Sequence, residues 1–453
     1  MAMHTIIATF EIVTPMFLGD ANQNATRIRE SSIKGALAFW WRALNYARYV
    51  KNDDHSQALK EMQKEEQLLF GGPKGQGAFL LRVVPSNLKT WPEEISKKNT
   101  KLYEDKNKDN LVGPGARYLG YGLIGAVGAK AAMLEDRSCF QEKQTFSVEF
   151  IFKSKGSIPS ILQALKLFGL FGGLGSRVRR GWGSVALISI VLPKQDKTLW
   201  KGPTNKTEYL EEIKNLLNEI GNFPSGTTFP LTAFSHQSRI WVGNKRCHHS
   251  RGNEGNLETS QSTAVWQNPL VALDWLGRAF LNYRSWGQSG FVGTESDVKQ
   301  RVQKQFKADH NWFYNTDDEQ SIVPQRSVFG IPHNYFKYFK DNKDWKGSVT
   351  SNCGSKVLDR RASPMFFHIH KIENNYIAVV SLFPTKFLPG KIVARRSTGA
   401  TTYSGAQRDG DADLMDQYGQ NSATGLDVLL DFVGHGPGHF TPNQVLSFEQ
   451  ILP

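Results

Sequence analysis

The chain has 453 residues, of which 40% are hydrophobic, 21% charged and 11% aromatic. This length predicts two or three domains with real cores, and the aromatic content excludes a largely disordered chain. Lys and Arg number 55 against 42 Asp and Glu, a net charge of +13, which suits either a polyanionic partner or a simply basic soluble protein.

Cys139, Cys247 and Cys353 form no CxxC pair. We therefore expect neither a disulfide framework nor a closed zinc site, in keeping with a reducing cytosol. The beginning of the chain has no basic stretch followed by a long apolar one, and no apolar run reaches membrane-spanning length. The expected protein is cytoplasmic, without membrane contact.

The chain opens with an expected strand and helix. Residues 4–18 are rich in β-branched and aromatic types and predict a strand that Pro15 weakens or ends. Apolar residues then recur at helical spacing in residues 32–50, and Ser31 and Ser32 are candidate N-caps.

The rest of the first part alternates charged insertions with regular elements. The charge-dense stretches 51–66 and 86–112 predict solvated insertions. The remaining predicted elements are strands at 77–85, 145–154 and 184–192, and a helix that opens at Pro159 and stops at Gly172 or Gly173.

The resulting order, βαββαβ, predicts an α+β protein with a ferredoxin-like fold. We expect an N-terminal domain at 1–193, a connector at 194–228 and a second ferredoxin-like domain at 229–453. The predicted elements of the second domain are a strand around 229–242, a helix at 269–283, a hairpin at 366–384 and a helix at 425–434.

Three polar tracts, 243–264, 292–321 and 398–424, complete the second half. Long structureless segments of this kind either bind a partner or are disordered. The sequence leaves both interpretations open.

The glycine-rich stretch 172–185, GGLGSRVRRGWGSV, is the sharpest local motif. Its glycines allow positive φ and a close approach by a partner's backbone, its arginines suit phosphate oxygens, and its tryptophan offers a stacking surface. The alternative is an ordinary turn with solvated arginines. The RNA contacts predicted here are Gly173, Gly175, Ser176, Arg177, Arg179, Arg180, Gly181 and Trp182.

Two further basic features are candidate RNA contacts. Lys34 near a helix N-terminus, with Arg42 two turns later, would favour an anion, although a core helix with two solvated cations explains both. Gly35 in the first helical turn indicates close packing there. Arg360 and Arg361, just before the predicted hairpin, either bind RNA or pair with carboxylates.

Catalytic groups are sparse. Cys247-His248-His249 is a poor metal motif because adjacent residues do not easily face one ion. His368 and His370 share a strand face without a carboxylate companion, and Asp20 is the one acid worth testing as a nuclease residue. No GxSxG, HExxH or Walker A pattern occurs. We expect no enzyme, no metal and no cofactor.

Five segments together resemble the family of first-named subunits of the Cmr complex, the type III-B CRISPR effector, within the RAMP superfamily. They are residues 12–24 (IVTPMFLGDANQN), 32–44 (SIKGALAFWWRAL), 170–185 (LFGGLGSRVRRGWGSV), 327–336 (SVFGIPHNYF) and 360–370 (RRASPMFFHIH).

The resemblance implies two ferredoxin-like domains and a position near the 3′ end of the guide RNA. It also implies contacts with guide RNA, target RNA and other Cmr or RAMP subunits, in a subunit that is not the nuclease. The chain is longer than expected for the family, so its insertions leave some interfaces open. The alternatives are a stand-alone RAMP endoribonuclease that processes CRISPR repeat RNA, and a scaffold that contacts only protein.

Overall fold

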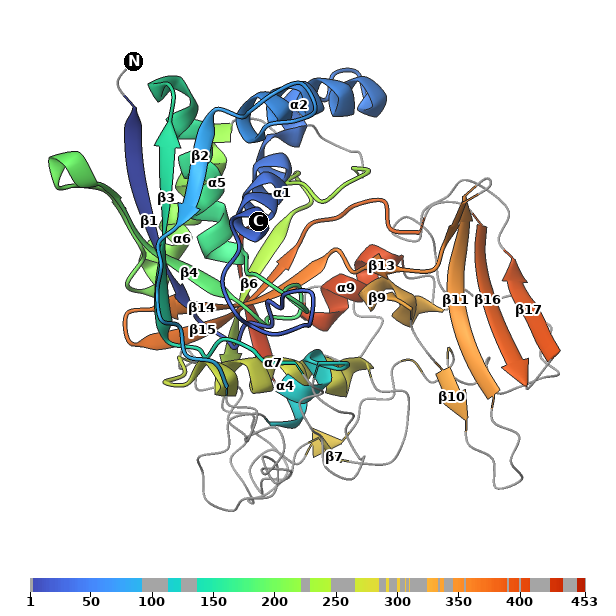
Figure 1. Ribbon diagram of the computed structural model, residues 1–453. Coiled ribbons are helices and arrows are strands. Elements are labelled where there is room, and N and C mark those ends of the chain that lie inside the picture. Colours follow the sequence, from blue (N-terminus) through green and yellow to red (C-terminus); the bar gives the residue numbers. More distant parts are fainter. Residues whose placement is uncertain are drawn as a thin grey trace.

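Figure 1 shows the protein as a computed structural model. The Cys247-His248-His249 motif and most of the three polar tracts lie outside the described residues. The structure describes residues 3–91, 113–123, 137–220, 229–245, 265–284, 324–332, 335–337, 345–353, 356–388, 391–398, 401–407, 424–434 and 446–452, together with 291–292, 300–301, Phe306 and Asp309.

The first half contains every strand and helix predicted from the sequence, with additions. Gly172 caps the end of the helix that Pro159 opens, as expected. The elements are β1 (His4–Ile12), α1 (Glu30–Tyr49), α2 (His55–Phe70), β2 (Phe79–Val83), α4 (Pro114–Leu119), β3 (Gln144–Phe152), α5 (Ile158–Phe171), β4 (Val185–Leu192), β5 (Lys197–Lys201) and α6 (Lys206–Ile220).

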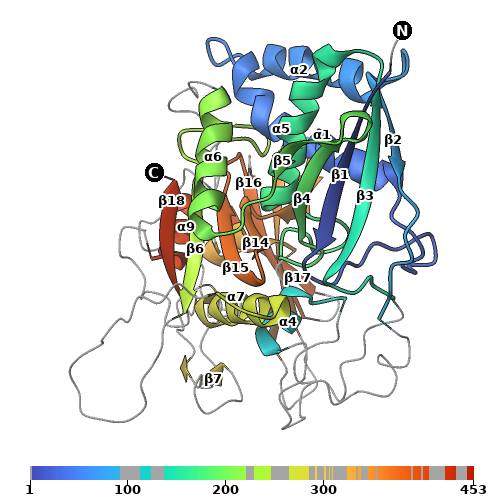
Figure 2. The same cartoon turned by 90° about the vertical axis from the view of Figure 1, so that its left-hand side faces the viewer.

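These strands form one antiparallel sheet in the order β2-β3-β1-β4-β5. In β1, Ile6, Ala8 and Phe10 are fully buried, whereas Ile7 and Thr9 between them are partly exposed. This alternation is typical of a strand with one covered face. Helices α1 and α5 pack side by side over the covered face, as Figures 1 and 2 show.

Two local predictions for the first half are wrong. Helix α1 has Arg29 as its N-cap, without a side-chain cap, so Ser31 and Ser32 lie inside the helix. The predicted solvated insertion 51–66 contains most of α2, whose few apolar residues lie at helical spacing and include the buried Ala58 and Met62. Sparse apolar residues are sufficient for a helix that needs only a narrow stripe against the core.

The predicted connector also contributes to the first half. Strand β5 extends the sheet beyond β4, and α6 buries Tyr209, Ile213 and Leu216 in the same core. Residues 197–220 are therefore part of a packed layer.

The second half forms an antiparallel sheet in the order β14-β15-β6-β18. The predicted helix at 269–283 and the hairpin are confirmed, whereas β6 covers only the end of the predicted strand 229–242. The elements are β6 (Arg239–Lys245), α7 (Pro269–Arg284), β14 (Met365–Ile372), β15 (Asn375–Leu382), α9 (Gly425–Phe432) and β18 (Leu446–Leu452).

Both sheets have the same strand order. We compare the sheets β2-β3-β1-β4 and β14-β15-β6-β18 by the order in which their strands occur in the chain. In both, the strand that comes first in the chain lies between the third and the fourth, and the second lies at the edge beside the third. The two halves also share apolar packing, because the Trp40 ring of α1 lies 6.0 Å from the rings of both Phe366 and Phe383. The protein thus belongs to the α+β class with antiparallel sheets.

A third antiparallel sheet was not predicted. It stands at the right of Figure 1, away from the first sheet. Residues 401–407 of the polar tract 398–424 form one of its strands. The strands are β10 (Tyr335–Lys337), β11 (Trp345–Cys353), β12 (Lys356–Leu358), β16 (Lys391–Thr398) and β17 (Thr401–Gln407).

Within the described ranges, no helix combines the length and hydrophobicity needed to cross a lipid bilayer.

Candidate nucleic-acid interface

The glycine-rich loop, residues 172–185, joins the two halves of the protein. Gly173 and Ser184 pair across its base. At its far side, the Arg179 carbonyl accepts a hydrogen bond of 3.0 Å from the backbone N–H of Phe367 in β14. Backbone contacts therefore hold the loop both at its base and at its far side.

The glycines of this loop serve the protein's own packing. Gly175, Gly181 and Gly183 have φ values of 90°, 82° and 66°, which only glycine adopts freely. A Cβ at Gly183 would lie 2.0 Å from the Leu174 carbonyl oxygen, and one at Gly175 would lie 2.4 Å from that of Phe17. The positive φ prediction is confirmed at these three positions, but the protein's own atoms fill the space predicted for a partner: backbone at Gly175 and Gly183, and the Leu273 side chain at Gly181.

Trp182 packs inside the protein. Its side chain is 1% exposed, its ring centroid lies 5.6 Å from that of Phe17, and its Nε1–H donates to the Ala116 carbonyl of α4 at 3.1 Å. The prediction of an accessible stacking surface at Trp182 is therefore wrong. The residue instead connects the loop to α4.

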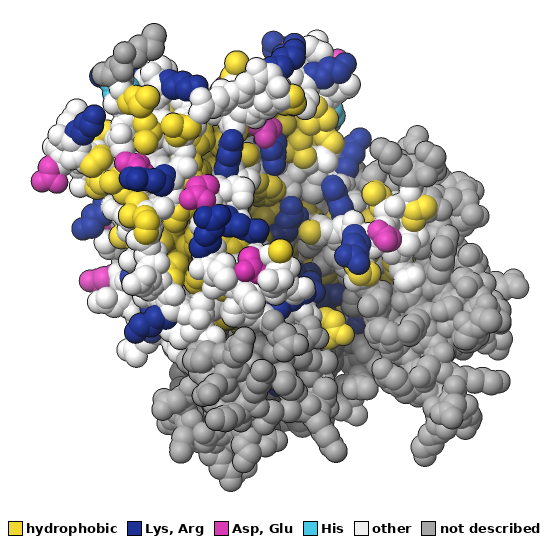
Figure 3. All heavy atoms as spheres, viewed as in Figure 1, with side chains coloured by type: hydrophobic (Ala, Val, Ile, Leu, Met, Phe, Trp, Pro, Cys, Tyr) yellow, Lys and Arg dark blue, Asp and Glu magenta, His cyan; other side chains and the backbone are white. Residues whose placement is uncertain are grey.

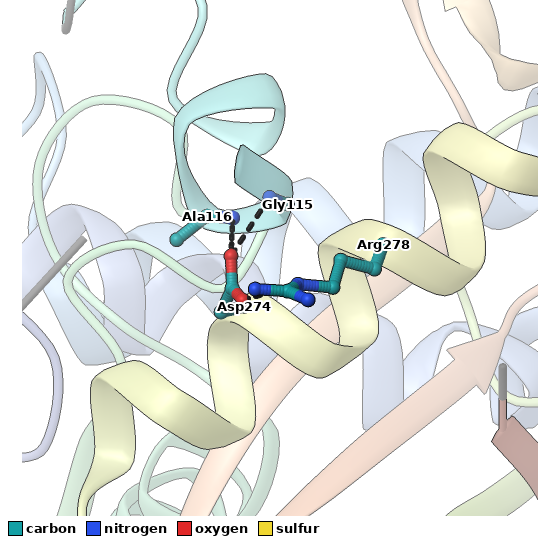
Figure 4. A network of polar contacts seen from close by, with 4 residues as sticks. All are labelled: Gly115, Ala116, Asp274 and Arg278. Carbon is teal, nitrogen blue, oxygen red and sulfur yellow. Dashed lines mark hydrogen bonds and ion pairs between the residues drawn. The ribbon is translucent and has the colours of Figure 1, made fainter. Parts of the chain in front are cut away.

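Helix α4 is held on its other side by a buried polar network on α7 (Figure 4). Asp274 Oδ1 accepts hydrogen bonds from the N–H groups of Gly115 at 2.8 Å and Ala116 at 3.1 Å. Its Oδ2 accepts one of 2.6 Å from Arg278 Nε. Burial raises the pKa of Asp274, and the Arg278 cation and the two N–H groups oppose that rise. Sequence reasoning missed this network because its partners lie 159 residues apart.

The structure brings Arg179 next to Arg361, which the sequence placed in separate candidate features. Arg179 Nη1 donates to the Ser363 carbonyl at 3.2 Å, and its guanidinium carbon lies 4.5 Å from the Phe366 ring centroid. Arg361 Nη2 donates to the Lys386 carbonyl at 2.7 Å. Burial, and then the Arg361 charge, lower the pKa of Arg179 to about 10, so this guanidinium stays charged at neutral pH.

Arg180 has a mainly internal role. It donates to the Phe329 carbonyl and lies 4.6 Å from the Phe280 ring centroid. Burial, and then the nearby Arg284, lower its pKa to about 9. Arg180 therefore remains a cation and links the loop to the second half.

Most of these cations lack a carboxylate partner. Among the described residues, no ion pair involves Arg177, Arg179, Arg180 or Arg361. Arg179 and Arg361 lie close to each other without a carboxylate partner, so an added anion would relieve their repulsion. We call these two residues, together with the exposed Arg177, Arg360 and Lys386, the basic cluster.

The residues of the basic cluster are accessible to solvent. Arg177, Arg360 and Lys386 are exposed, and Arg179 and Arg361 are partly exposed. Figure 3 shows Lys and Arg side chains grouped across the middle of the face seen in Figure 1, with acidic side chains scattered between them.

The predicted cations of α1 have different surroundings. Arg42 forms a 2.5 Å ion pair with Glu66 of α2, so its charge is neutralised within the chain. Lys34 is exposed. Gly35 is exposed too, and a Cβ there would meet no atom within 4 Å. The prediction of close packing at Gly35 is therefore wrong, and the first turns of α1 present an open surface.

The candidate acid and histidines have structural contacts. Asp20 Oδ1 accepts hydrogen bonds from the N–H groups of Asn22 at 2.8 Å and Asn24 at 3.0 Å, which stabilise its loop. His368 and His370 are each 1% exposed. In the ranges that the structure describes, no three His, Cys, Asp or Glu side chains gather in a metal-binding arrangement.

Comparison with known proteins identifies relatives of this chain. The family model of the RAMP superfamily matches residues 9–186. The chain is 27% identical over 195 residues to the CRISPR system Cmr subunit Cmr1-1 of Pyrococcus furiosus, a match that covers 43% of this chain and 49% of that protein. It is 23% identical over 190 residues to Cmr1-2 of the same organism, covering 40% of this chain and 95% of that protein. The chain thus spans about half the length of the first of these relatives.

Two solved structures overlap most of the chain. The crystal structure of Cmr1 from P. furiosus in its apo form matches with a TM-score of 0.47 and 18% identity, covering 85% of this chain and 89% of that one. A chain of the type III-B Cmr-beta complex bound to cognate target RNA, solved by cryo-EM, matches with a TM-score of 0.38 and 11% identity, covering 90% and 96%.

Proposed function

We propose that the protein is a non-catalytic, RNA-binding subunit of a type III-B CRISPR effector, the Cmr complex. It lies near the 3′ end of the guide RNA, contacts guide and target RNA, and docks on neighbouring Cmr or RAMP subunits in the cytoplasm. The match of the RAMP superfamily model to residues 9–186 supports this proposal. The named Cmr relatives support the complex. The observation that carries the RNA-binding role is the basic cluster without carboxylate partners.

The proposal includes two ferredoxin-like units. The four-strand order that the two antiparallel sheets share, with helices α1 and α5 in the first half and α7 and α9 in the second at corresponding places in the chain order, supports this assignment. The units correspond to residues 1–193 and 229–453, and the segment between them adds β5 and α6 to the first.

We choose the proposed RNA contacts by two criteria: the side chain is at least partly exposed, and its charge has no carboxylate partner among the described residues. We assign phosphate contacts to Lys34 and to the basic cluster, because guanidinium and ammonium groups of this kind bind phosphate oxygens. Arg42, Arg180 and Trp182 instead support the fold, through Glu66, Phe329 and Ala116 respectively.

A salt series with one double variant tests the proposal. Arg360 and Lys386 are both exposed, so Arg360→Gln with Lys386→Gln should keep the fold. Phosphate-dominated binding of a single-stranded RNA weakens as salt rises, with a slope of about 0.7 per neutralised phosphate. Removing two cations should therefore reduce the slope of log affinity against log salt by about 1.4.

Arg82→Gln is the matched control, since Arg82 is 68% exposed and already paired with Glu149 at 2.6 Å. It should leave the salt slope unchanged. Salt-independent binding, or equal slopes for all three proteins, would contradict an RNA-binding role.

The endoribonuclease alternative has its own test. Purified protein alone is incubated with CRISPR repeat RNA, and a RAMP endoribonuclease would yield fragments of defined length. We expect intact RNA, because Asp20, the one candidate nuclease acid, is bonded to its own loop.

A further inference from the structure

One exposed aromatic side chain lies beside the glycine-rich loop. Tyr121 follows Gly120, the C-cap of α4, and it is 56% exposed. Among the described residues it is the one aromatic group in the set of strongly exposed large hydrophobic side chains. Exposed aromatic rings are the surfaces on which unpaired bases stack, so Tyr121 has the accessibility that Trp182 lacks.

The guanidinium group of Arg177 lies close to Tyr121. Arg177 Nη2 is 3.3 Å from the position that a Cβ on Gly122 would occupy, which places the guanidinium beside the residue after Tyr121. Burial, and then the charge of Arg137, lower the pKa of Arg177, while Tyr121 opposes the change. Within the described part of the chain, Arg177 forms no ion pair.

We propose that Tyr121 and Arg177 form a subsite for one unpaired nucleotide of the bound RNA. The base stacks on the Tyr121 ring, and its phosphate accepts hydrogen bonds from the Arg177 guanidinium group. The nucleotide must be unpaired, because inside a duplex both faces of a base are covered by its neighbours. This subsite rests on the proposed RNA-binding function and defines which form of RNA the protein prefers.

The contacts of α4 with α7 and with Trp182 fix the position of the Tyr121 ring. Asp274 caps the first turn of α4, and Trp182 donates to the Ala116 carbonyl in its middle. A Cβ on Gly120, the residue before Tyr121, would lie 2.9 Å from Trp182 Nε1, so the end of α4 rests on the indole. Trp182 is thus a positioning residue for Tyr121, which reduces the entropy lost when a base stacks there.

The experiment measures RNA affinity of Tyr121→Ala and Tyr121→Phe by fluorescence anisotropy. The probes are a labelled single-stranded RNA, the same strand annealed to a complement of equal length so that every nucleotide is paired, and a strand with the same phosphates but abasic nucleotides. Tyr121→Ala should weaken binding of the single strand about 5- to 150-fold. It should leave the paired and the abasic strands within about two-fold, and Tyr121→Phe should bind like the unchanged protein.

An equal effect of Tyr121→Ala on all three probes, or no effect on any, overturns the subsite. The double variant Arg360→Gln with Lys386→Gln, measured on the same probes, shows whether the subsite alone is wrong or the proposed RNA-binding function is wrong as well. If it weakens all three probes while Tyr121→Ala changes none, RNA binding stands and the subsite is wrong. If neither variant changes affinity, both proposals are wrong.

Discussion

The buried histidines of β14 predict that the protein loses stability as pH falls from neutral to about 5. His368 and His370 are each 1% exposed, and His368 Nε2 lies 3.3 Å from His370 Nδ1. The His370 ring centroid lies 4.4 Å from that of Tyr209 in α6. Burial lowers the pKa of His368 to about 3. Burial and the neighbouring His368 lower the pKa of His370 well below its ordinary value of 6.5.

The size of the effect follows from proton linkage. In the unfolded chain each imidazole binds a proton near pH 6.5, whereas the folded protein keeps both neutral, so acid favours unfolding. The stabilisation is complete above about pH 6.5 and declines by at most about 1.4 kcal/mol per pH unit for each histidine. Between about pH 6.5 and 5 the loss is about 2 kcal/mol per histidine, or about 4 kcal/mol for the pair.

Urea unfolding at several pH values between about 7.5 and 5 measures this loss. The double variant His368→Gln with His370→Gln should lack most of this pH-dependent loss. Subtracting the free energies of unfolding of the two proteins at each pH cancels the contributions of the other titrating groups. One such group is Asp309, whose pKa burial raises to about 6. His236→Gln, at an exposed position, is the control and should behave like the unchanged protein. The same pH dependence in the unchanged protein and the double variant would refute the reasoning.

Three further variants test packing by urea unfolding. Asp274→Ala leaves Arg278 buried without its counter-charge and should lower the free energy of unfolding by about 3–5 kcal/mol; a loss under about 1 kcal/mol would contradict this role. Gly277→Ala places a Cβ 2.1 Å from the Gly115 carbonyl and should cost about 1–3 kcal/mol, with no loss contradicting the close approach of α4 and α7. Gly35→Ala meets no atom within 4 Å and should raise the free energy of unfolding by about 1 kcal/mol; a decrease would mean that the site is not open.

Elements with a strong local signal could be predicted from the sequence. Pro159 fixes the opening of α5, and Gly172 ends it. The two apolar-rich runs at 365–372 and 375–382 give the β14–β15 hairpin, which turns at Glu373 with φ of 47°. The sheet of β10, β11, β12, β16 and β17 was missed, because its strands are largely polar and its central pairing joins β11 to β16, in which Trp345 and Thr398 are distant in the chain. Local periodicity carries no information on such pairings.

The candidate site shows where local reasoning ends. The cationic residue types could be named from the sequence, but their surroundings depend on contacts such as that of Arg179 with Ser363, 184 residues away. The sequence predicted that both the arginines and the tryptophan of the glycine-rich loop face a partner. Tertiary packing separates them, since it directs Trp182 into α4 and leaves Arg177 exposed.

The same packing gives the glycine-rich loop a fixed backbone. Three left-handed glycines let the loop fold back on itself and on residues 15–18, which fixes the direction of the arginines between them. Arginines held on a rigid backbone lose less entropy on binding phosphate than arginines on a flexible loop. Under the proposed RNA-binding function, a glycine substitution should therefore weaken RNA binding by displacing Arg177 and Arg179 rather than by removing a contact of its own.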